Sequence, residues 1–184
     1  MKTRTLLVLG AALLLASARV AATDVPNSTA TKIGVYDSRL LAYAHFWSEP
    51  ATRERNELIA QARAAKTAAD PDRFHKLDVQ LVAMQRRSHL QVFSTAPADE
   101  AMAALHERLP ALQRELGVGR LVSRWDEPAL ATVPDADRID VTDRLLREFL
   151  PHPSDYHQKV IASMKDAKPL PLAEATKLAD EGKL

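Results

Sequence analysis

The fold is decided by residues 31–38, Thr-Lys-Ile-Gly-Val-Tyr-Asp-Ser, which predict a short strand followed at once by a helix. β-branched and aromatic side chains alternate in this stretch, as they do in half-buried strands. Asp37 and Ser38 both belong to the residue types that cap helices, and the apolar residues between Arg39 and Trp47 then suit a helix. We therefore predict a strand over residues 32–36 and a helix directly after it.

A long helical insert is predicted next, from about residue 50 to residue 117. Ser48 can cap a renewed helix, and Pro71 suits the first turn of another that follows an Asp70 cap. Apolar residues recur at helical spacing in narrow stripes, which is typical of helices that pack in pairs. We predict an antiparallel hairpin in which the third stripe faces Leu77 and Leu81. The three stripes are Leu58, Ala62, Ala65 and Ala69; Phe74, Leu77, Leu81 and Met84; and Met102, Leu105, Leu109, Leu112 and Leu116, the last interrupted by Pro110.

The periodicity changes from helical to alternating after the glycines at positions 117 and 119. Residues 120–125 predict a second strand and residues 131–133 a weaker third, before a helix over residues 140–150. We expect residues 32–36 to lie beside residues 120–125 in one sheet. The predicted fold class is α+β, mostly helical, with a small β-sheet body and the hairpin inserted between strands.

The proline-containing tail, residues 151–184, follows the last predicted helix. It contains Pro169 and Pro171 and a short helical patch near residues 172–178. Such a segment is either an arm docked on the domain or a flexible extension.

The first 22 residues have the features of a secretory signal peptide. Lys2 and Arg4 form a basic start, residues 6–16 are an apolar run, and small residues follow. The run is short for a membrane span, although an N-terminal membrane anchor is the alternative. We therefore expect an exported protein without residues 1–22.

Composition excludes several kinds of site. The 184 residues include no cysteine, which excludes a disulfide framework, a thiolate zinc site and a cysteine nucleophile. Loss of residues 1–22 would lower Lys and Arg from 25 to 22 against 24 Asp and Glu, so the net charge would fall from +1 to −2. That balance argues against a nucleic-acid partner.

The order of elements resembles the OmpH/Skp family of periplasmic chaperones. The motifs that carry the resemblance are Lys-Ile-Gly-Val-Tyr-Asp at residues 32–37, Gly-Arg-Leu-Val at residues 119–122 and Asp-Val-Thr at residues 140–142. The resemblance covers about residues 31–150, and it assigns residues 23–150 to one domain. It implies a periplasmic holdase that acts without ATP on unfolded or outer-membrane proteins, with no cofactor, and it implies a homotrimer.

Apolar patches between the inserted helices are the expected client-binding surface. An envelope scaffold or assembly protein that uses the same helices for one fixed partner is the alternative. The apolar stripes also fit simple packing of the helices within the chain, from which periodicity cannot distinguish client binding. The candidate client-binding residues are Leu58, Leu77, Leu81 and Met84.

Enzymatic and metal-binding interpretations depend on isolated residues, since no catalytic motif is present. Asp37 and Asp126 follow predicted strands and could form the acid–base pair of an exported hydrolase; alternatively, they are a helix cap and a turn residue. His152, Asp155 and His157 could hold a metal ion, or could lie in a solvated linker. The adjacent residues 86 and 87, both arginine, could bind an acidic partner or lie on a solvated helix face.

Overall fold

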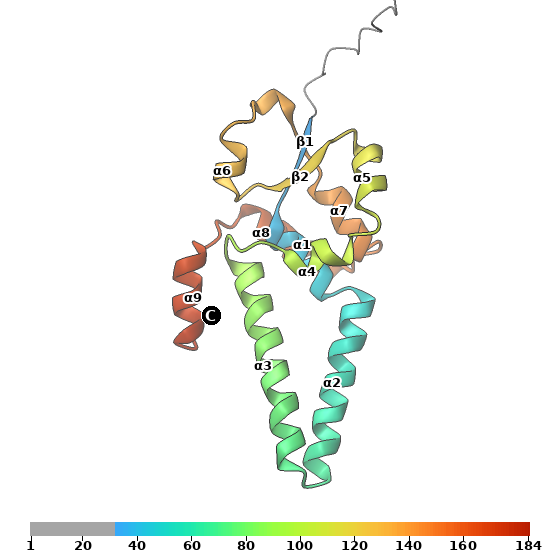
Figure 1. Cartoon of the computed structure of the whole chain (residues 1–184), viewed down its shortest axis with the longest axis vertical. Coiled ribbons are helices and arrows are strands. Elements are labelled where there is room, and N and C mark those ends of the chain that lie inside the picture. The colour runs from blue at the N-terminus through green and yellow to red at the C-terminus, as the bar shows by residue number, and fades with distance from the viewer. Residues whose placement is uncertain (1–31) are drawn as a thin grey trace, which may run out of the picture.

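The computed structural model describes residues 32–184, so the predicted signal peptide lies outside the described residues. Three short strands form one sheet in the order β2-β1-β3, and Figure 1 labels β1 and β2 of this sheet. These strands are β1 (Ile33–Tyr36), β2 (Arg120–Ser123) and β3 (Arg138–Asp140). Ile33 lies opposite Arg120 of β2 and Arg138 of β3. The predicted pairing of the first strand with residues 120–125 is confirmed.

Both strand pairs are parallel. This corrects the predicted α+β class, whose sheets are typically antiparallel. Strand direction follows from the connections, because parallel neighbours need a long crossover while a tight turn gives antiparallel ones. The chain between β1 and β2 contains five helices, and the chain between β2 and β3 contains one helix and a 3₁₀ turn. The described residues are mostly helical, as predicted, around a small parallel sheet.

The third strand lies at residues 138–140, so its prediction at residues 131–133 was wrong. Asp126 caps the short helix α6 (Glu127–Leu130), and residues 131–133 form the turn that follows it. The Arg138 side chain donates hydrogen bonds to the backbone oxygens of Leu130 and Val133, which holds this turn against β3.

The first three helices begin directly after their predicted capping residues, which confirms these predictions. These are α1 (Ser38–Phe46), α2 (Glu49–Thr67) and α3 (Pro71–Phe93). The side chains of Asp37, Ser48 and Asp70 each accept a hydrogen bond from a backbone N–H in the first turn of the helix they precede.

Helices α2 and α3 are the part of the predicted insert that projects from the sheet (Figure 1). They lie side by side and are joined by the turn at residues 68–70. Ala62, Ala65 and Leu77 are buried where the helices meet, with Leu58 and Leu81 half-buried against them. Small alanines let the two helices approach closely, but they bury little apolar area.

The third apolar stripe packs against the sheet, so the expectation that it faces Leu77 and Leu81 was wrong. The helix ends after α4 (Asp99–Ala104), and a new helix, α5 (Leu109–Leu116), begins with Pro110 in its first turn. Proline is accepted there because the first turn lacks backbone hydrogen bonds in any case. Leu105 and Leu112 are therefore buried beside β1, α1 and α7 (Thr142–Phe149).

The C-terminal tail is docked on the rest of the chain. It contains α8 (Asp155–Asp166), which the sequence analysis did not predict, and α9 (Leu172–Asp180), where a helical patch was expected. Ile161 and Met164 of α8 pack on the cluster of Leu40, Ala44 and Leu146. Leu170 forms a parallel bridge with Ser94, which places α9 beside α3.

Burial predicts unequal costs for two substitutions in α5. Leu112 is 2% exposed, whereas Leu109 is only half-buried at the edge of the same cluster. We expect Leu112→Ala to lower the free energy of unfolding by about 2–5 kcal/mol, and Leu109→Ala to cost clearly less. Urea denaturation of both variants measures the difference. Equal losses would contradict the packing of α5 described here.

Candidate functional site

The carboxylate of Asp37, at the end of β1, is fully buried and forms an ion pair with Arg39. Arg39 donates to it from the backbone N, from Nε at 3.2 Å and from Nη2 at 2.9 Å. The indole Nε1 of Trp125, just after β2, donates to the same carboxylate at 3.0 Å. The Asp37 backbone N–H donates to the hydroxyl of Thr142, at the start of α7.

The other side of Arg39 holds the end of α8. Its Nη1 donates to the backbone oxygen of Ala167 at 2.7 Å, and its Nη2 donates to that of Met164 at 3.0 Å. The guanidinium carbon lies 4.8 Å from the centre of the Trp125 ring, a cation–π distance. Asp37 and Arg39 therefore connect β1, α1, α7, α8 and Trp125, which lies two residues after β2.

These bonds bear on the hydrolase interpretation. Asp37 is occupied on both carboxylate oxygens and has no exposed surface. Asp126 accepts a hydrogen bond from the backbone N–H of Ala129 and caps α6. A general acid or base must reach substrate, and the buried Asp37 carboxylate cannot do so without breaking its bonds. The geometry therefore favours structural roles for both residues.

A second candidate site is a groove between α1, α3 and α8, which we call the aromatic groove. Its volume is about 660 Å³, within the range of ligand sites. Trp47, Phe93 and Tyr156 are 37%, 49% and 63% exposed. Such a group of exposed aromatic side chains is typical of a binding surface. The groove is lined by Tyr43, Phe46, Trp47, Gln85, Ser88, His89, Val92, Phe93, Tyr156, Lys159, Val160, Ser163 and Met164.

Edge-to-face ring contacts order one end of the groove. The His157 ring lies 6.1 Å from that of Tyr43 at a near-perpendicular angle, and 5.7 Å from that of Trp47. The Tyr43 side chain is buried, and its hydroxyl has no hydrogen-bond partner among the described residues. Burial, and then the nearby phenol of Tyr156, raises the pKa of Tyr43. Tyr43 therefore keeps its proton and remains a hydrogen-bond donor.

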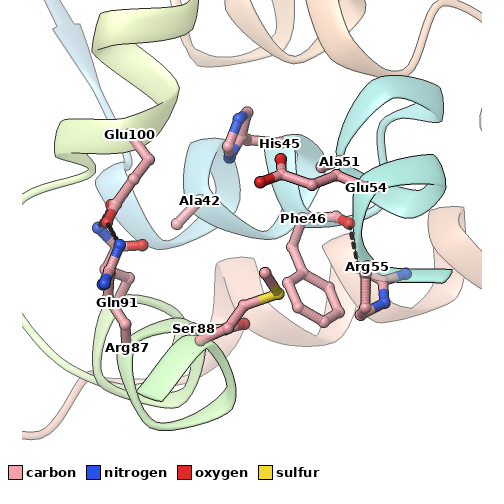
Figure 2. A pocket seen from close by; sticks show the side chains of 11 residues that line it. Ala42, His45, Phe46, Ala51, Glu54, Arg55, Arg87, Ser88, Gln91 and Glu100 are labelled. Atoms are coloured by element: carbon pink, nitrogen blue, oxygen red, sulfur yellow. Dashed lines mark hydrogen bonds and ion pairs between the residues drawn. The ribbon is translucent and has the colours of Figure 1, made fainter. Parts of the chain in front are cut away.

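A smaller pocket of about 180 Å³ lies between α1, α2 and α3 (Figure 2). Phe46 lines both this pocket and the aromatic groove. Arg55 donates to the Phe46 backbone oxygen at 2.9 Å and stacks 4.1 Å from the Phe46 ring. Arg87 pairs with Glu100 at one side of the pocket, at 2.7 Å. Arg87 and Glu100 are thus committed to each other, whereas Arg55 is held by the backbone oxygen and ring of Phe46.

His45 lies in this smaller pocket near two carboxylates (Figure 2). Burial lowers the pKa of His45 below its ordinary value of 6.5, although Glu100 and Glu54 act in the opposite direction. Hydrogen bonds from Gln91 and Arg87 hold the pKa of Glu100 below its ordinary value, against the effect of burial. His45 is therefore neutral, and Glu100 ionised, near pH 7.

The structure places the sequence-predicted client-binding residues largely between helices. Leu58, Leu77 and Leu81 pack in the α2–α3 interface, while Met84 lines the smaller pocket. Sequence reasoning missed the aromatic groove because one of its walls is α8, which was not predicted. The signal that could have revealed it is the series Tyr156, Val160 and Met164, which recurs every four residues as on one helix face.

The remaining candidate groups are engaged or dispersed. Arg86 pairs with Asp180 of α9, and Arg87 with Glu100, so both arginines make intrachain contacts. His157 belongs to the aromatic contacts of the groove. Within residues 32–184, no group of three or more histidine, aspartate or glutamate side chains has a geometry that could hold a metal ion.

Comparison of the chain with protein-family models, curated proteins and solved structures gives no match. The resemblance to periplasmic chaperones therefore depends on the motifs in the sequence alone. In the part of the chain that the structure describes, no helix combines the length and apolar character needed to cross a membrane.

Removing one partner of the Asp37–Arg39 pair should destabilise the protein strongly. We expect Asp37→Ala or Arg39→Ala to cost about 3–5 kcal/mol, because each leaves a buried charge without its partner. The double variant should lose less than the sum of the two single losses. Urea denaturation of the three variants tests this coupling. Additive losses would mean that the two side chains act independently.

His45 should make stability depend on pH near neutrality. The unfolded imidazole takes up a proton near pH 6.5, whereas the folded one does so only at lower pH. Stability is therefore highest above pH 6.5 and decreases as the pH falls towards the folded pKa. NMR titration of His45 should give a midpoint below 6.5. Glu54→Gln should lower it further, because it removes a charge that favours protonation; a rise would contradict this electrostatic account.

Proposed function

We propose that the chain is an exported, ATP-independent, holdase-like chaperone that binds unfolded envelope proteins. The observation that carries this proposal is the aromatic groove, whose exposed rim consists of Trp47, Phe93 and Tyr156. Aromatic rings offer large apolar contact areas at little cost in conformational entropy. An open groove of this kind can accept short apolar segments of many sequences.

The energetics suit capture and release without a nucleotide. One or two apolar side chains buried in the groove would contribute about 1.5–3 kcal/mol each, before the cost of ordering the segment. Such binding is weak for one site and becomes useful when several sites act on one client. The homotrimer implied by the family resemblance would provide three grooves, and native mass spectrometry of the protein without residues 1–22 tests that assembly.

The groove aromatics should be required for holdase activity. We expect the protein to reduce light scattering when a denatured outer-membrane protein is diluted from urea, and the double variant Phe93→Ser/Tyr156→Ser to lose most of this effect. The matched control is Val79→Ser/Val82→Ser, because these valines are 52% and 57% exposed on α3 but do not line the groove. The control variant should retain the activity.

Two outcomes would contradict the proposal. Unchanged aggregation across several unrelated clients would exclude a holdase and favour an envelope scaffold with one fixed partner. Equal losses in the groove variant and the valine control would show that apolar surface in general, rather than the groove, supports the activity. Circular dichroism of both variants checks that they remain folded.

A further inference from the structure

We infer that the aromatic groove selects one kind of client segment, an extended apolar stretch with an acidic side chain next to it. The inference rests on the proposed function and specifies its substrate class. It depends on two features of the groove: the sign of the charge along its lining, and the unpartnered hydroxyl of Tyr43.

The charge along the groove is entirely of one sign. No aspartate or glutamate lines it, while Lys159 of α8 does. Lys159 makes no ion pair with any residue of the described part of the chain, although Asp155 stands four residues earlier on the same helix. The other basic side chain in the lining, His89, contacts the backbone oxygen of Leu184 through Nδ1. Lys159 is therefore the cation available to an occupant.

Tyr43, in the same groove lining as Lys159, supplies a hydrogen-bond donor. Its side chain is 6% exposed, and its hydroxyl has no partner among residues 32–184. A buried hydroxyl without a partner is costly, so nearly all such groups in proteins are bonded to protein or water. An occupant that brings an acceptor oxygen to Tyr43 would remove this cost, and Lys159 in the same lining favours an occupant with negative charge. Carboxylates are the acceptors that suit both groups.

The selectivity is tested with short acetylated and amidated peptides of one apolar sequence, rich in Leu, Phe and Val. They differ at a single position, which is Asp, Asn or Lys, and fluorescence anisotropy with the full chain measures their affinity. We expect the Asp peptide to bind about two- to fivefold more tightly than the Asn peptide, as an exposed ion pair allows, and the Lys peptide to bind weakest. The preference should shrink at high salt.

Charge reversal gives the sharpest control. Lys159→Glu should invert the order, so that the Lys peptide binds more tightly than the Asp peptide. Lys76→Glu, at an exposed lysine near the start of α3 and outside the groove, should leave the order unchanged. Inversion by both variants would show a long-range effect of net charge and would overturn the assignment to Lys159.

Tyr43→Phe separates binding from folding. The hydroxyl has no partner among residues 32–184, so its removal should leave the melting temperature unchanged or raise it. Affinity for the Asp peptide should nevertheless fall about three- to tenfold, because the occupant loses a hydrogen bond. Unchanged affinity would contradict the role of Tyr43.

The experiment distinguishes failure of this inference from failure of the proposed function. Equal binding of the Asp, Asn and Lys peptides would overturn the inference and leave a holdase with an unselective groove. No measurable binding of any peptide, together with unchanged client aggregation, would overturn both. Binding of all three peptides that survives Phe93→Ser/Tyr156→Ser would place the client site outside the groove.

Discussion

The buried ion pair of Asp37 and Arg39 is the interaction on which the rest of the structure depends. A buried charge is tolerated only when it is paired and hydrogen-bonded, so every partner of this pair has to be in place in the folded state. Those partners are the indole of Trp125 after β2 and the backbone oxygens of Met164 and Ala167. The hydroxyl of Thr142, at the start of α7, accepts from the backbone N–H of Asp37. Segments more than 100 residues apart are thereby fixed around the end of one strand.

The same pair explains why a groove exists at all. Arg39 holds the C-terminal end of α8, and Ile161 and Met164 of that helix pack on the cluster of Leu40, Ala44 and Leu146. With α8 fixed in this position beside α1, the end of α3 becomes the third wall of the aromatic groove. Trp47 and Tyr156, which are far apart in sequence, consequently line one surface. The aromatic groove is therefore formed by packing between segments that are distant in sequence.

Local signals were sufficient for the parts of the fold that depend on neighbouring residues. Asp37, Ser48 and Asp70 predicted the starts of three helices because a cap bonds to the backbone only two or three residues ahead. Strand 138–140 escaped prediction because it is only three residues long and is stabilised by pairing with β1. Helix α8 escaped because its repeat of Tyr156, Val160 and Met164 was not recognised, and its position depends on distant partners such as Arg39. The aromatic groove escaped with them, because recognising it requires knowing where α8 docks.

The aromatic groove lies at a different place from the client-binding surface that the sequence predicted. Leu58, Leu77 and Leu81 form much of the interface between α2 and α3, together with Phe74 and two small alanines. Binding a client there would require separating the helices and exposing Leu77, at a cost of about 1.5–3 kcal/mol for that side chain alone. The rim of the groove is exposed already, so an apolar segment can bind without breaking existing contacts. Weak, reversible binding is favoured at a surface that is exposed before the client arrives. The aromatic groove beside α2 and α3 is therefore a better candidate site than the interface between these helices.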